Sequence, residues 1–251
     1  PNIYGGLVSR YFRIPYAMNI TGLGTAFEGS CFLTALINRL YRFAGKRAKV
    51  IFFENSENLR IFIDRQIVDK SRAVLLSGAG VNLNEFSFAE YPLSDKTIRF
   101  LFIGRVMKEK GIDELFLAAK WVKAHYDNVV FDIVGPFEEN YQRVIDDLQV
   151  HGIICYHGYQ SDVKPFICDA HCFVLPSYHE GMANTLLECG AMGRPIITCD
   201  IHGCMEAVIP QISGFLCMAK SAESLYNAIC RFVDLSHEQK IEMGRASYNH
   251  I

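Results

Sequence analysis

The chain has 251 residues, of which 50% are hydrophobic and 21% are charged, a balance that is typical of a globular protein. Its net charge of −2 excludes a general attraction to nucleic acid, and the sequence shows neither a signal peptide nor an uncharged apolar run of the ~18 residues that a membrane span needs. The nine cysteines include no CxxC pair, which argues against a zinc ribbon or a thioredoxin-like site and favours the reducing cytosol.

The first part of the chain predicts about half of a Rossmann-like domain. Short apolar runs alternate there with amphipathic stretches, which predicts strands at residues 16–20, 48–53 and 73–76 and helices at residues 28–43 and 59–66. A polar segment broken by Pro92 follows, so we predict an incomplete N-terminal domain at residues 1–92 and a second domain at residues 93–251.

The second part predicts a complete parallel sheet. Strands are expected at residues 97–103, 129–134, 153–156, 172–175, 195–198 and 214–217, and helices at residues 113–125, 138–150, 162–168, 185–192, 222–233 and 237–248. Strands that are apolar on both faces, with a helix after most of them, indicate a doubly wound α/β domain.

The two parts also differ in charge. Residues 1–90 hold 11 Lys and Arg against 7 Asp and Glu, a balance of +4, and residues 91–251 hold 14 against 20, a balance of −6. Two domains with different partners would show such a difference, and so would surface charge without functional meaning.

A loop with two cations follows the predicted strand at residues 97–103. Gly104 permits a sharp turn, Arg105 offers a planar fork to phosphate oxygens, and Lys110 adds a point charge just before a helix N-terminus, which itself favours anions. Ligands bind at the carboxyl ends of strands in open α/β sheets, so the pattern predicts a diphosphate site. A solvated basic loop fits the same spacing.

A second loop with candidate functional residues follows the predicted strand at residues 172–175. It carries Glu180 and Gly181, and the next helix carries Glu188. Gly181 permits close approach of a ligand, Asn184 is a candidate N-cap, and the free amides of that helix end are suited to phosphate or sugar oxygens. The alternatives are an exposed loop carboxylate at Glu180 and a capping box in Thr185-x-x-Glu188.

These residues resemble a known family. Glu180-x7-Glu188, with Pro176-Ser177 before it and Gly190-Ala191-Met192-Gly193-Arg194-Pro195 after it, resembles the signature of family 4 retaining glycosyltransferases of the GT-B fold. Phe102-Ile103-Gly104-Arg105 and Lys110-Gly111 resemble the other diagnostic block of that family, in the expected order and spacing. The resemblance implies two Rossmann-like domains, of which the second binds the nucleotide-sugar donor and the first binds the acceptor.

The first part resembles one branch of the family. Pro1-Asn2-Ile3-Tyr4-Gly5-Gly6-Leu7 and Asn19-Ile20-Thr21-Gly22-Leu23-Gly24 are similar to the capsular and lipid-linked oligosaccharide transferases. This implies transfer of a hexose or an N-acetylhexosamine from a nucleotide sugar, with UDP favoured, to a lipid-linked or polysaccharide acceptor at the cytoplasmic face of the membrane. Many family members carry His where this chain has Thr21.

The resemblance also implies roles for individual residues. Arg105 and Lys110 would neutralise the donor diphosphate, Glu180 would contact the donor sugar, and Glu188 would bind the ribose hydroxyls. The rest of the implied donor site is formed by Gly104, Gly181, Met182, Ala183, Asn184 and Thr185. Met182-Ala183 replaces the Phe-Pro of many members, which implies a differently shaped sugar pocket. The resemblance implies no metal and no cofactor, because the cations stabilise the leaving group.

Residues 39–49 are basic with interleaved aromatic residues and end a predicted helix. Such a segment is suited to anionic lipid, and it is equally typical of cations that favour a helix C-terminus. Three other functions stay open: a sugar-nucleotide epimerase, a glycan phosphorylase of the same two-domain plan, and a non-catalytic module that binds nucleotide sugars.

Overall fold

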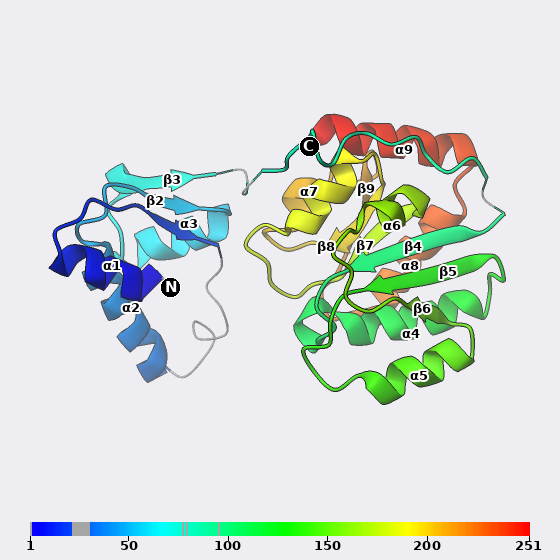
Figure 1. The fold of residues 1–251 in the computed structure, drawn as a ribbon, viewed down its shortest axis with the longest axis horizontal. Coiled ribbons are helices and arrows are strands. Elements are labelled where there is room, and N and C mark those ends of the chain that lie inside the picture. The colour runs from blue at the N-terminus through cyan, green and yellow to red at the C-terminus, as the bar shows by residue number, and fades with distance from the viewer. Residues whose placement is uncertain (1, 22–30, 77, 79, 95) are drawn as a thin grey trace. The chain divides into compact units, whose positions relative to one another are not determined.

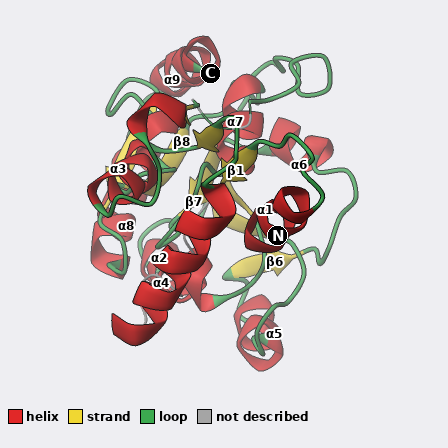
Figure 2. Cartoon of the chain, turned by 90° about the vertical axis from the view of Figure 1, so that its left-hand side faces the viewer, coloured by secondary structure: helices red, strands yellow, loops and turns green. Residues whose placement is uncertain are grey.

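The computed structural model describes residues 2–21, 31–76, 78, 80–94 and 96–251 (Figure 1). Its contacts divide the chain into two units. The first unit contains the described residues up to Gly80 together with Glu180–Met182, and the second contains Val81–His179 and Ala183–Ile251. Figure 2 marks the helices, strands and loops of both units by colour.

The first unit has a parallel three-stranded sheet in the order β1-β2-β3. Its elements are α1 (Asn2–Tyr11), β1 (Met18–Ile20), α2 (Cys31–Gly45), β2 (Ile51–Phe53), α3 (Ser56–Asp64), the 3-10 helix η2 (Lys70–Arg72) and β3 (Ala73–Leu75). Phe53 and Phe62 are fully buried and pack edge to face, 5.1 Å between ring centroids, in the core between sheet and helix.

Local chemistry sets the limits of these helices. Asn55 caps α3, because its side chain accepts a hydrogen bond from the Asn58 backbone at 2.8 Å. Arg72 donates to the carbonyl oxygens of Gly45, Lys46 and Ala48 at the end of α2. The helix α1 is absent from the sequence-based predictions, and the predicted start of α2 at residue 28 lies outside the described residues.

The second unit has a parallel six-stranded sheet in the order β6-β5-β4-β7-β8-β9. Its strands are β4 (Ile98–Ile103), β5 (Val129–Val134), β6 (Ile154–Tyr156), β7 (Cys172–Leu175), β8 (Ile196–Cys199) and β9 (Gly214–Cys217). Its helices are η3 (Lys108–Lys110), α4 (Ile112–Lys123), α5 (Gln142–Val150), α6 (Lys164–Asp169), α7 (Asn184–Ala191), η4 (Met205–Ala207), α8 (Ala222–Val233) and α9 (His237–His250). The chain winds outward from β4 through β5 to β6 and then returns to β7 on the other side of β4.

The sheet of the second unit is covered on both faces. The helix α4 packs against α8, α7 packs against α9, and Figure 1 shows these two pairs on opposite faces of the sheet. All residues of β7 and β8 are buried, as expected for parallel strands between two helical layers. The predicted parallel doubly wound sheet is therefore confirmed.

The second unit begins at Val81, twelve residues before the predicted domain boundary. The cause is Arg194, whose side chain is fully buried and donates to the carbonyl oxygens of Ala89 at 2.7 Å and Glu90 at 2.8 Å. Tyr91 donates from its hydroxyl to the carbonyl oxygen of His171 at 2.8 Å. These bonds attach the polar segment to the second unit, because a buried guanidinium needs several acceptors.

Candidate active site

The candidate site lies where the strand order of the second unit reverses. β4 and β7 are neighbours in the sheet, but the crossovers that leave them run to opposite sides. In open α/β sheets this switch point leaves a crevice outside the carboxyl ends of the strands, where ligands bind. The two loops that the sequence singles out, after β4 and after β7, both start there.

The loops after β4 and β5 are in direct contact. The Gly104 backbone donates to the Val134 carbonyl oxygen at 3.0 Å, and Val106 forms a parallel bridge with Phe137. Gly135 has a φ of 142°, and a Cβ there would lie 1.9 Å from the Gly104 carbonyl oxygen. Among the described residues of these two loops, Gly135 and Gly111 have the positive φ that favours glycine.

Arg105 is exposed, and its side chain forms only a weak ion pair. Its Nη1 lies 3.5 Å from Oε1 of Glu138, and both side chains are about half exposed, at 53% and 49%. Exposed ion pairs of this kind contribute ~0.2–1 kcal/mol. Arg105 can therefore exchange Glu138 for a phosphate at small cost.

Lys110 is held on the adjacent turn. It ends the 3-10 helix η3 and is followed by Gly111, whose left-handed conformation (φ 71°) starts α4. A Cβ on Gly111 would lie 2.0 Å from the Pro176 carbonyl oxygen, and the Tyr178 backbone donates to the Glu109 carbonyl oxygen at 2.9 Å. The cationic loop after β4 is thus packed directly against the end of β7.

The helix α7 begins at this same carboxyl edge without a side-chain cap. Its N-cap is Ala183, and Asn184 is its first residue. The prediction of Asn184 as N-cap is wrong, and so is the capping box of Thr185 and Glu188, because Thr185 already lies inside the helix. Side-chain chemistry therefore leaves the first-turn amides of Asn184 and Thr185 uncapped, which keeps them suited to an anion.

Glu188 is half-buried one turn into α7. Burial, and after it the negative charge of Glu85, raises the pKa of the Glu188 carboxyl. A carboxylate in this state gains from hydrogen-bond donors such as sugar hydroxyls, which replace the water that it has lost.

Three predicted site residues group with the first unit, namely Glu180, Gly181 and Met182. Asn55 donates from Nδ2 to the carbonyl oxygens of Glu180 at 3.3 Å and Gly181 at 3.0 Å. A Cβ on Gly181 would lie 1.3 Å from the carbonyl oxygen of Thr21. The backbone of Thr21 therefore approaches Gly181 closely, and contact of Gly181 with a ligand stays a prediction.

Two tyrosine–carboxylate pairs were not singled out from the sequence. Tyr178 donates to both carboxylate oxygens of Glu114 at 2.8 and 2.7 Å, and Tyr141 donates to Oδ1 of Asp113 at 2.9 Å. Both carboxylates lie in the first turn of α4, where acids favour the helix dipole. The sequence places the acids there, but nothing in it identifies their tyrosine partners.

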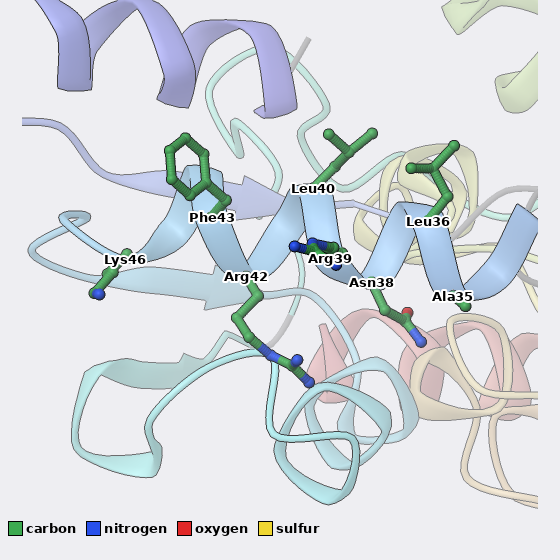
Figure 3. Close-up of a pocket in the computed structure, with 8 residues that line it drawn as sticks. All are labelled: Ala35, Leu36, Asn38, Arg39, Leu40, Arg42, Phe43 and Lys46. Carbon is green, nitrogen blue, oxygen red and sulfur yellow. The ribbon is translucent and has the colours of Figure 1, made fainter.

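A separate hollow of about 920 Å³ lies along α2 in the first unit. It is lined by Ala35, Leu36, Asn38, Arg39, Leu40, Arg42, Phe43 and Lys46. Figure 3 shows Leu36, Leu40 and Phe43 on one side of the helix and Asn38 and Arg42 on the other. Arg42 is engaged in the fold, since it donates to the carbonyl oxygens of Arg65 at 2.8 Å and Gln66 at 2.9 Å.

Neither a metal site nor a membrane-spanning helix occurs in the described part of the chain. No group of three or more His, Cys, Asp or Glu side chains is placed to hold a metal ion among those residues. Within the same ranges, no helix has both the length and the apolar composition to cross a membrane.

Residues 84–250 match the family model described as glycosyl transferases group 1. The chain belongs to this family. The match covers the whole sheet of the second unit and both loops at its switch point. It confirms the predicted enzyme class, a glycosyltransferase, and gives no support to the epimerase, phosphorylase or non-catalytic alternatives.

Curated relatives of this group 1 glycosyltransferase include two transferases named for undecaprenol-linked acceptors and one named for capsular polysaccharide biosynthesis. The chain is 28% identical to the N,N'-diacetylbacillosaminyl-diphospho-undecaprenol alpha-1,3-N-acetylgalactosaminyltransferase of Campylobacter jejuni, over 98% of this chain and 68% of that protein. It is 28% identical to the UDP-Gal:alpha-D-GlcNAc-diphosphoundecaprenol alpha-1,3-galactosyltransferase of Escherichia coli, over 92% of this chain and 64% of that protein. CapM of Staphylococcus aureus, a capsular polysaccharide biosynthesis glycosyltransferase, is 26% identical to this chain over 56% of this chain and 40% of CapM. The chain thus spans between 40% and 68% of the lengths of these relatives.

Solved structures confirm the GT-B fold of this group 1 glycosyltransferase. HepE of Anabaena, solved with UDP and glucose, matches 98% of the chain and 69% of its own length with a TM-score of 0.81 and 15% identity. The C-terminal domain of LpcC from Francisella tularensis matches 68% of the chain and 96% of its own length with a TM-score of 0.59 and 18% identity.

Proposed function

We propose that the protein transfers a hexose or an N-acetylhexosamine from a UDP-sugar to an undecaprenyl-diphosphate-linked saccharide, with retention of anomeric configuration, in the synthesis of a capsule or another cell-surface glycan. The observation that carries the proposal is the loop of Arg105 and Lys110, which packs against the end of β7 at the switch point of the sheet. The printed activities of the Campylobacter and Escherichia relatives support the choice of donor and acceptor.

The reaction breaks the bond between the anomeric carbon and the diphosphate oxygen. The acceptor hydroxyl attacks the anomeric carbon from the side of the departing diphosphate, and its proton passes to the leaving phosphate. Arg105 and Lys110 stabilise the charge that develops on that phosphate. Preorganised cations supply this stabilisation, so we propose that the reaction needs neither a metal nor another cofactor.

The rest of the donor is held by hydrogen bonds. Glu188 accepts from the ribose hydroxyls, and Glu180 contacts the hydroxyls of the donor sugar. The remaining contacts come from Gly104, Gly181, Met182, Ala183, Asn184 and Thr185. In this assignment residues 93–251 bind the donor and residues 1–92 bind the acceptor, with the segment from Val81 to Pro92 attached to the donor-binding fold.

The same proposal places the enzyme at the cytoplasmic face of a membrane. The hollow on α2 combines apolar side chains with Arg39 and Lys46, a combination suited to a surface of anionic lipid that also carries the acceptor. Exposed Tyr4, Tyr11 and Phe12 on and just after α1 add aromatic groups that favour a membrane interface.

The test uses the full-length enzyme with two donors and two acceptors. UDP-N-acetylgalactosamine and UDP-galactose are combined with undecaprenyl-diphosphate carrying either diacetylbacillosamine or N-acetylglucosamine, in the presence of EDTA, and the anomeric configuration of the product is read by NMR. We expect one combination to give a product with the configuration of the donor. Arg105→Ala and Lys110→Ala should each lower kcat at least tenfold, which corresponds to ~1.4 kcal/mol.

Lys108→Ala is the matched control, because Lys108 is an exposed cation of the same short helix η3. It should keep kcat within about twofold of wild type if catalysis depends on where the cations lie and not on the net charge of the loop. Near-unchanged kinetics of both Arg105→Ala and Lys110→Ala would remove the two cations from the mechanism.

A further inference from the structure

Tyr178 joins the two loops of the candidate active site. It is the third residue after β7, and only 7% of its surface is exposed. Its hydroxyl donates to both carboxylate oxygens of Glu114, at 2.8 and 2.7 Å, and its backbone donates to the Glu109 carbonyl oxygen at 2.9 Å. The Lys220 ammonium lies 5.1 Å from the centroid of its ring.

The two acceptors of Tyr178 flank Lys110 along the chain. Glu109 precedes Lys110 in η3, and Glu114 follows it in the first turn of α4. One side chain and its own backbone therefore fix both ends of the turn that carries this cation. Burial, and after it the bond to Glu114, raises the pKa of Tyr178, so its phenol stays protonated as a donor across the neutral range.

We infer that Tyr178, acting through Glu114, is a positioning residue for departure of the donor diphosphate, because it holds the Lys110 turn against the end of β7. This inference rests on the proposed function. Tyr178 touches no reacting atom in this scheme.

The pair of Tyr141 and Asp113 supplies an internal comparison. It has the same chemistry and joins the same first turn of α4, but it does so from the loop after β5. Tyr141 makes no bond across Lys110, because its own backbone donates to the Glu139 carbonyl oxygen. A general loosening of α4 should follow from the loss of either tyrosine hydroxyl, whereas displacement of Lys110 should follow only from the loss of Tyr178.

Loss of the Tyr178 hydroxyl should affect the transition state more than the ground state. A bound diphosphate has several partners and tolerates a shifted cation, whereas the charge of the leaving phosphate is stabilised only by a cation already in place. A supporting residue that moves the cation away therefore lowers kcat with little change in the KM for the donor.

The experiment measures kcat and donor KM for Tyr178→Phe, Tyr141→Phe, Glu114→Gln and Glu114→Ala in the full-length enzyme, with the UDP-sugar that the wild type turns over. We expect Tyr178→Phe and Glu114→Ala to lower kcat about five- to tenfold, with KM within about twofold. Glu114→Gln keeps an acceptor oxygen and should retain at least about half of the wild-type kcat. Tyr141→Phe should match wild type in kcat even where it lowers Tm.

A Tyr178→Phe variant with wild-type kcat and a lowered Tm would overturn the inference, and so would an equal loss of kcat in Tyr141→Phe. If Tyr178→Phe does not fold, Glu114→Ala provides the same test, since it removes the acceptor of the same hydrogen bond. Loss of activity in Arg105→Ala and Lys110→Ala tests the proposed function independently. With those losses present, wild-type kcat in the Tyr178 and Glu114 variants overturns this inference alone.

Discussion

Among single residues, Glu188 is the one whose ionisation should make the stability of the fold depend on pH. Burial and the charge of Glu85 raise its pKa, so the folded state holds its proton more tightly than the unfolded state does. The stabilisation that comes from this protonated carboxyl is therefore fully present below the unfolded-state pKa of about 4.3. It is lost as the pH rises through the pKa that Glu188 has in the folded state. At neutral pH the ionised Glu188 destabilises the fold.

Glu188→Gln removes this charge and should raise the free energy of unfolding at pH 7.5 by ~0.5 kcal/mol, a small value because the side chain is only half-buried. At pH 4 the gain should shrink toward zero, because wild-type Glu188 is then largely protonated. Urea denaturation at both pH values measures the difference. A gain that is equal at the two pH values would show that charge is not the cause.

The residue scale also shows what local sequence reasoning could supply. Arg105 and Lys110 lie in the loop after a predicted strand and Glu188 lies one turn into a predicted helix, because a strand end and a helix start follow from short-range patterns. The capping role given to Asn184 is wrong because α7 starts one residue earlier than an Asn184 cap requires. A shift of one residue lies within the ordinary uncertainty of a helix boundary, yet it changes the role of every side chain at that end.

Among the elements, the junction of η3, α4 and the end of β7 depends on one glycine. Gly111 has a left-handed φ of 71°, and a Cβ there would lie 2.0 Å from the backbone oxygen of Pro176. Gly152 has a similar φ of 64°, but no heavy atom lies within 4 Å of its added Cβ. The two positions thus share the conformational requirement and differ only in the space available.

Gly152→Ala should cost ~1 kcal/mol of unfolding free energy, the strain of a left-handed alanine. Gly111→Ala should cost at least ~3 kcal/mol, because the backbone of β7 must also move. Urea unfolding of the two variants beside wild type gives both values. Equal costs at the two positions would contradict the tight packing of the cationic loop against β7.

At the scale of the whole molecule, the proposed membrane contact depends on cations of the basic first part. Arg39 and Lys46 are exposed on α2 in the first unit, beside exposed Leu36 and Phe43. Each cation near an anionic bilayer contributes ~1 kcal/mol to binding. A protein that contacts lipid through this surface should therefore lose affinity sharply when both cations are removed.

Arg39→Ala combined with Lys46→Ala should lower partitioning onto vesicles of mixed phosphatidylcholine and phosphatidylglycerol about thirtyfold, the equivalent of ~2 kcal/mol. Vesicle sedimentation measures the partitioning. Lys120→Ala with Arg143→Ala, two exposed cations of the second unit, is the matched control and should leave it unchanged. Wild-type protein that sediments equally with neutral and anionic vesicles would refute the contact.

The sequence by itself determined the type and order of most elements, the parallel doubly wound sheet and the two loops with cations and carboxylates. These features follow from patterns within a few residues, which fix local conformation and the burial of each strand face. The tertiary structure alone decided that Arg194 binds a segment 105 residues away and that Tyr178 meets Glu114 across 64 residues. Such contacts depend on the order of the strands in the sheet, because the crossovers bring distant loops to one edge, and no local pattern encodes which side chains meet there.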